Sequence, residues 1–125
     1  MNGYQRKGRV KKRRRKSDLP KLLTGANGRA ILLRAQGKTD EAVLLLYDII
    51  SKAPKAAAPY QSLGNIHEDQ GNLQQALKFY MVAANLRGSH ATEWMELANM
   101  CIQMKEEKLA FDCFSKALKT AKTNQ

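Results

Sequence analysis

The chain has 125 residues and a formal net charge of +11, and nine of its 22 Lys and Arg residues lie in residues 1–16, which contain no acidic residue. The remaining 109 residues carry 13 basic and 11 acidic side chains, so the protein is a nearly neutral body with a basic N-terminal arm. Its length suits one modest domain. No apolar run approaches the roughly 20 residues of a membrane-spanning helix, and the basic N-terminus lacks the apolar core of a signal peptide.

We predict that the arm, residues 1–20, is disordered, because its like charges repel and it has little to bury. Its densest block fits both a nuclear import signal and a contact with nucleic-acid phosphates, and a purely solubilising tail is a third interpretation. The block consists of Lys11, Lys12, Arg13, Arg14, Arg15 and Lys16. Because no aromatic residues alternate with these charges, any DNA binding would be non-specific and steeply salt-dependent.

Residues 23–56 form the first of three predicted helical hairpins. We expect its first helix from about Thr24 to Gln36, a tight turn at Gly37, and a second helix capped by Thr39. Apolar residues at helical spacing, Val43, Leu46, Ile49 and Ile50, give that second helix a buried face.

Residues 57–90 form the second predicted hairpin and carry the clearest repeat pattern. Tyr60, Leu63, Gly64 and His67 have the spacing W-x2-L-G-x2-Y, and Ala76 and Tyr80 supply A-x3-F, which together are typical of the tetratricopeptide repeat (TPR). Gly71-Asn72 marks the turn, and Leu73, Ala76, Leu77, Tyr80, Ala83 and Ala84 are expected to face inward on the second helix.

Residues 91–124 repeat the pattern once more, with Trp94, Leu97, Ala98 and Cys101 in the first half and Ala110 and Phe114 in the second. Three repeats in phase predict an all-α TPR solenoid of six antiparallel helices over residues 21–125. Ala42, Ala76 and Ala110 are expected where the two helices of each hairpin cross closely, and residues 30, 64 and 98 are their small counterparts on the first helices.

The residues that could suggest chemistry fall in core positions of the repeat. A row of aromatic residues could form a base-stacking platform, but each of them occupies an inward position, and His67 does too. We expect Cys101 and Cys113 to be reduced packing residues. The sequence contains no catalytic constellation, no metal-ligand spacing and no glycine-rich phosphate loop, so we predict a protein that is not an enzyme and has no cofactor, metal or small-molecule substrate.

Binding by solenoids usually occurs on the concave side, which the first helices of the hairpins line. The predicted partner-binding groove consists of Asn27, Ile31, Arg34, Gln61, Asn65, Glu68, Asp69, Met95, Asn99, Ile102 and Gln103. Asn65 and Asn99 occupy equivalent positions and could bind a peptide backbone, or they could be polar residues that an exposed face simply tolerates. Only Asn65 matches the carboxylate clamp by which some TPR proteins bind chaperones, so a co-chaperone role is not expected.

Several stretches outside the repeat signature resemble the TPR subunit of transcription factor TFIIIC. They are KKRRRKSDLP (11–20), EDQGN (68–72), VAANLR (82–87), EWMELANM (93–100) and AFDCFSKAL (110–118). The resemblance implies a nuclear scaffold whose repeats contact TFIIIB and other TFIIIC subunits near the promoters of RNA polymerase III genes. Members of that family carry many more repeats than three, so the chain resembles part of such a subunit. The alternative is a general TPR peptide-binding adaptor with a basic tail for nucleic acid or solubility.

Overall fold

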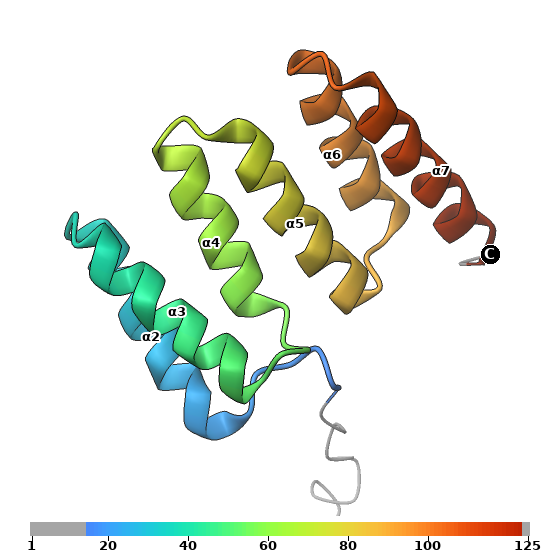
Figure 1. Ribbon diagram of the computed structural model, residues 1–125. Helices are drawn as coiled ribbons and strands as arrows, with labels where there is room; N and C mark the ends of the chain where they lie inside the picture. Colours follow the sequence, from blue (N-terminus) through green and yellow to red (C-terminus); the bar gives the residue numbers. More distant parts are fainter. Residues whose placement is uncertain (1–14, 124–125) are drawn as a thin grey trace, which may run out of the picture.

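A computed structural model describes residues 15–123 (Figure 1). All regular structure in this range is helical, in three successive antiparallel hairpins, which confirms the predicted all-α TPR solenoid. The helices are α2 (Lys21–Ala35), α3 (Thr39–Lys52), α4 (Ala58–Asp69), α5 (Leu73–Arg87), α6 (Ala91–Gln103) and α7 (Glu107–Thr123). Within the same range no helix is both long and apolar enough to cross a membrane.

The helix boundaries follow from the turn residues, with two differences from the sequence prediction. Helix α2 begins at Lys21 rather than Thr24, because Pro20 sets the start: its carbonyl accepts a hydrogen bond from the Leu23 N–H at 2.9 Å. Thr39 does not cap α3; it is the first helical residue, and Lys38 precedes it without a side-chain cap.

The hairpin turns place one residue each in the left-handed region. Gly37 and Gly71 have φ of 79° and 80°, whereas Lys105 takes the equivalent position in the third hairpin at φ 61°. A side chain makes this conformation unfavourable by roughly 1–2 kcal/mol, so the third turn is the most strained of the three. Gly88, where the repeat pattern has proline, instead ends α5 with φ 63°.

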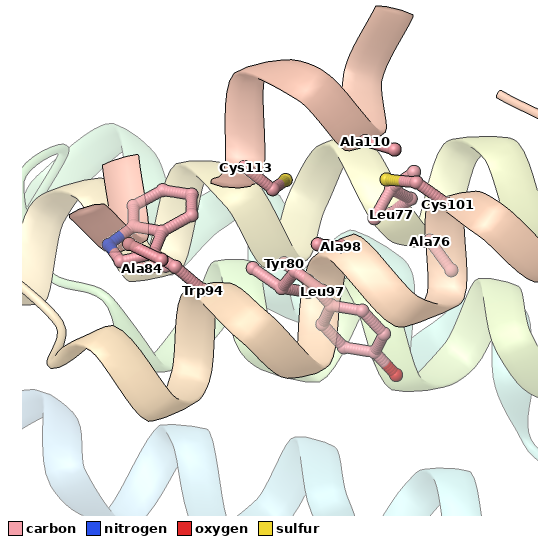
Figure 2. Close-up of a cluster of buried hydrophobic side chains, with 11 residues drawn as sticks. Ala76, Leu77, Tyr80, Ala84, Trp94, Leu97, Ala98, Cys101, Ala110 and Cys113 are labelled. Atoms are coloured by element: carbon pink, nitrogen blue, oxygen red, sulfur yellow. The ribbon is translucent and has the colours of Figure 1, made fainter. Parts of the chain in front are cut away.

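Buried side chains form two clusters on either side of the α4–α5 hairpin. One cluster joins α2, α3 and α4 around Leu46, Ile49 and Leu63. The other joins α5, α6 and α7, and Figure 2 shows its members Leu77, Tyr80, Trp94, Leu97, Cys101 and Cys113. The three crossing alanines, Ala42, Ala76 and Ala110, are at most 5% exposed, as predicted. Leu73 is an exception to the inward set, because its position at the start of α5 leaves it 41% exposed.

The end of the basic arm contacts the first hairpin. The Ala57 N–H donates a hydrogen bond to the Ser17 carbonyl at 2.9 Å, and Leu19 packs against the cluster of α2, α3 and α4. Residues 15–20, which we assigned to a disordered arm, therefore run beside the α3–α4 junction. The disorder predicted for residues 1–14, including Lys11 to Arg14, lies outside the described residues.

Candidate functional site

Tyr80 of α5 lies directly against the backbone of α4 at Gly64. A Cβ atom added at Gly64 would be 2.5 Å from Tyr80 Cδ1 and 3.1 Å from Cζ, so the ring occupies space that only glycine leaves open. The Tyr80 hydroxyl points away from the other labelled apolar side chains (Figure 2) and bonds to side chains of α4. The Tyr80 position therefore combines a buried ring with a polar end outside the core.

The Tyr80 hydroxyl contacts two predicted groove residues. Its oxygen is 2.5 Å from Glu68 Oε1 and 2.8 Å from Asn65 Oδ1. A hydroxyl has a single proton to donate, so we assign the donated bond to the Glu68 carboxylate and turn the Asn65 amide so that its nitrogen donates to the tyrosine. Burial, followed by the bond to Glu68, raises the pKa of Tyr80, which keeps it a neutral donor at physiological pH.

Arg34 of α2 reaches across the first repeat junction to Asp69 of α4. The guanidinium donates two bonds, Nε to Oδ2 at 2.5 Å and Nη2 to Oδ1 at 2.8 Å. The bond to Arg34 lowers the pKa of Asp69, and the same bond raises the pKa of Arg34. Arg34 also interacts electrostatically with Tyr80 and Glu68, so Arg34, Asn65, Glu68, Asp69 and Tyr80 form one set of polar groups, which we call the polar cluster.

A hollow next to the polar cluster separates α4 from α6. Helix α4 packs against both α2 and α3, whereas α6 packs against α5 and its backbone does not come close to that of α4. The inner part of this α4–α6 hollow has a volume of about 170 Å³ and reaches Tyr80. Its lining as a whole consists of Gln61, Tyr80, Arg87, His90, Thr92, Glu93, Glu96, Leu97 and Met100.

Charge in the α4–α6 hollow is predominantly acidic. Arg87 of α5 donates to Gln61 Oε1 at 3.2 Å and forms an ion pair with Glu93. It therefore links α4 and α6 at the mouth of the hollow. Glu96 lies exposed one turn further along α6. Together with the polar cluster, the concave side presents carboxylates and amide oxygens, which suit a ligand rich in N–H donors or positive charge.

Comparisons with known proteins agree with this architecture. The family described as "Tetratricopeptide repeat" matches residues 57–90. The chain is 40% identical over 115 residues to human "General transcription factor 3C polypeptide 3", which covers 92% of this chain and 13% of that protein. It is 28% identical over 116 residues to the Saccharomyces cerevisiae "Transcription factor tau 131 kDa subunit", covering 93% of this chain and 10% of that protein. The chain belongs to the TPR-subunit family of transcription factor TFIIIC.

This TFIIIC-family chain thus corresponds to a small part of each of these relatives. A solved structure of "MamA RS-1 ArsTM double mutant" superposes with a TM-score of 0.59 at 18% identity, over 80% of this chain and 56% of that one. At that identity the similarity supports the helical-repeat fold alone.

The predicted groove residues of the TFIIIC-family chain fall into four groups. Arg34, Asn65, Glu68 and Asp69 meet in the polar cluster, and Gln61 lines the hollow. Asn27 Oδ1 is buried and has no hydrogen-bond partner among the described residues. The other positions are exposed and lie apart from the cluster: Ile31 on α2, and Met95, Asn99, Ile102 and Gln103 on α6.

Sequence reasoning missed Tyr80, Arg87 and Glu93 as groove residues. Tyr80 occupies a core position of the repeat, where the first and third hairpins have apolar residues. The available signal was the pairing of a tyrosine with Gly64, because the other hairpins pair their apolar residue with alanine. Arg87 and Glu93 lie at the α5–α6 junction, which the repeat pattern does not assign to the groove.

The two thiols of the chain are free and fully buried. Burial raises the pKa of Cys101 and raises that of Cys113 to about 12, so both are thiols at neutral pH. His67 stacks on Phe79, with ring centroids 5.4 Å apart. Over the described residues, no three or more His, Cys, Asp or Glu side chains are grouped as metal ligands.

Proposed function

We propose that the chain is a non-catalytic nuclear scaffold module that binds a peptide segment of a partner protein in its concave groove. By its family, the expected partners are TFIIIB and other subunits of TFIIIC. The observation that carries the proposal is the concave polar surface itself, in which the polar cluster and the α4–α6 hollow adjoin one another through Tyr80. Binding rather than catalysis is supported by the inert, buried thiols and by the use of the polar groups in structural contacts.

The groove favours a segment with basic or amide donors. Glu93 and Arg87 pair with each other at the hollow, whereas the exposed Glu96 takes part in none of the ion pairs of the described residues. A positively charged side chain entering the hollow would meet the Glu96 carboxylate of α6 and the amide oxygen of Gln61 on α4. Such complementarity raises specificity and association rate more than raw affinity.

The test measures binding of the intact chain to purified TFIIIB components and TFIIIC subunits. We expect Glu96→Lys to weaken the interaction about tenfold or more, since mispaired charges at an interface cost several kcal/mol. Glu107→Lys is the matched control, because Glu107 is also exposed but lies at the start of α7, outside the hollow. Equal effects of the two substitutions would contradict the groove, and no binding to any TFIIIB or TFIIIC component would contradict the partner assignment.

We also propose that the basic block, Lys11 to Lys16, directs nuclear import. Substituting its six basic residues by glutamine should leave the chain distributed between nucleus and cytoplasm. Unchanged nuclear accumulation in cells depleted of the assembly partners would contradict this role.

A further inference from the structure

The two edges of the solenoid differ in which helix ends and turns lie there. At one edge lie the hairpin turns, and at the other lie the starts of α4 and α6 and the ends of α3, α5 and α7 (Figure 1). We call these the turn edge and the junction edge. The described end of the basic arm runs along the junction edge, where Ser17 bonds to Ala57.

Basic side chains predominate at the junction edge. They are Arg15, Lys16, Lys21, Lys52, Lys55, Arg87, Lys116, Lys119 and Lys122, against the acidic residues Asp18, Asp48 and Glu93. At the turn edge acidic residues predominate: Asp40, Glu41, Glu68, Asp69, Glu106 and Glu107 stand against Arg34, Lys38, Lys105 and Lys108. The nearly neutral body is therefore electrically polarised from one edge to the other.

Helix dipoles explain only part of this polarity. Positive charge is favourable in the last turn of a helix, which accounts for Lys52, Arg87 and Lys122. It does not account for Lys16 and Lys55, which lie outside the helices. The excess at the junction edge therefore needs another explanation.

Two basic hollows mark the ends of the junction edge. One, of about 270 Å³, is lined by Lys16, Lys52 and Lys55 together with Asp18. Lys16, the last residue of the basic block, therefore lies beside the lysines of the α3–α4 junction. The other, of about 360 Å³, is lined by residues that include Lys116 and Lys119 of α7.

Several of these lysines lack an acidic partner in the part of the chain that the structure describes. Its ion pairs do not include Lys16, Lys55 or Lys119. Lys116 is held in place by a 2.6 Å bond to Asn85 and by the Trp94 ring, whose centroid is 5.2 Å from its ammonium nitrogen. The edge thus offers positive charge that the fold does not neutralise.

We propose that the junction edge, including Arg15 and Lys16, is a binding surface for the phosphate backbone of duplex DNA. Helices α3, α5 and α7 belong to three successive hairpins and end at different points along this edge, so their charges would meet different phosphates of a duplex that carries a charge every ~1.7 Å. The surface has no helix or aromatic row to read bases, so binding is independent of sequence. It adjoins the concave groove of the proposed function at Arg87 and Glu93, whereas Lys55 and Lys119 lie outside the lining of the α4–α6 hollow.

The experiment compares two charge reversals in the full chain by fluorescence anisotropy with a short random-sequence duplex. Lys55→Glu/Lys119→Glu changes the junction edge, and Lys38→Glu/Lys108→Glu makes the same change in net charge at the turn edge. All four lysines are exposed, and the ion pairs of the described residues include none of them. Circular dichroism checks that both variants keep the fold.

We expect the junction-edge variant to lose two phosphate contacts. Its plot of log K against log salt should be shallower by about 1.8, since each contact contributes about 0.9. Across a fourfold rise in salt, the unmodified chain should therefore lose about tenfold more affinity than this variant. The turn-edge variant should keep the original slope.

Three outcomes would overturn the proposal. Equal slopes for the two variants would mean that net charge alone matters, and loss of all binding on neutralising Lys11 to Arg14, with Arg15 and Lys16 kept, would mean that the junction edge does not bind. Equal affinity for polyglutamate and for the duplex would point to an acidic protein instead. Because the probe is DNA, failure here leaves the protein-binding groove untouched, and the reverse also holds.

Discussion

The packing of Tyr80 on Gly64 predicts whether an added methyl group at Gly64 raises or lowers the stability of the chain. In Gly64→Ala the added methyl would lie 2.5 Å from Tyr80 Cδ1, far inside the ~3.5–4.0 Å of a favourable carbon contact. Overpacking of this kind costs about 1–3 kcal/mol, and displacement of the ring also weakens the bonds to Asn65 and Glu68. The better helix propensity of alanine returns only about 1 kcal/mol. We expect a net loss of about 1–2 kcal/mol.

The same substitution should become favourable when the ring is absent. The first hairpin pairs Ala30 with Leu46 at the equivalent positions, and both are 1% exposed. In a Tyr80→Leu background, Gly64→Ala recreates that pair, so the helix propensity of alanine should now stabilise the chain by about 0.5–1 kcal/mol.

The assay is a double-mutant cycle measured by urea unfolding, followed by circular dichroism. A Tyr80→Phe background serves as the control, because it keeps the ring and removes the hydroxyl; there Gly64→Ala should remain destabilising. The argument fails if Gly64→Ala has the same effect in the tyrosine and leucine backgrounds, because the coupling energy between the two positions would then be zero.

Three further predictions concern acid stability, thiol reactivity and the face of α7. Because the pKa of Asp69 is lowered in the fold, its contribution to the free energy of unfolding is present above the ordinary pKa of ~3.9 and is lost as pH falls through the folded pKa. In Asp69→Asn the free energy of unfolding should therefore fall less steeply with decreasing pH. An unchanged pH dependence would contradict the pairing with Arg34. Cys101 and Cys113 are fully buried, so iodoacetamide should modify them only after unfolding, and rapid labelling of the native chain would show that this core opens. Leu77 is 0% and the equivalent Phe111 70% exposed; Leu77→Ala should cost about 2–5 kcal/mol and Phe111→Ala under ~0.5 kcal/mol in urea unfolding, whereas similar costs would mean that both are buried in solution.

The fold could be predicted because the repeat fixes residue size as well as polarity. Ala42, Ala76 and Ala110 recur at the interval that brings paired helices together, and all three are buried. Local capping was less predictable: the side chain of Thr39 makes no cap bond, because the chain enters α3 one residue earlier at Lys38. A single sequence shows which residues can cap a helix but does not give the backbone dihedral angles that decide it.

The candidate site could be predicted only in part, because its main contacts join residues far apart in the chain. The bond from Arg34 to Asp69 spans 35 positions, and nothing in either helix alone indicates the partner. Tyr80 was assigned to the core correctly by its ring, yet its hydroxyl belongs to the groove. The sequence pattern describes residues as wholes, whereas this residue is divided between two environments.

The junction between the second and third hairpins differs from the first, because the backbones of α4 and α6 are not close whereas those of α2 and α4 are. At the first junction α4 packs against both α2 and α3, whereas at the second α6 packs against α5, with side-chain bonds from Arg87, from Lys116 to Asn85 and from Gln74 to Glu106. A junction at which a helix packs against one helix changes its angle more easily than one at which it packs against two. We therefore expect the angle between the last two hairpins to change more easily than that between the first two, and a segment bound between α4 and α6 would fix that angle.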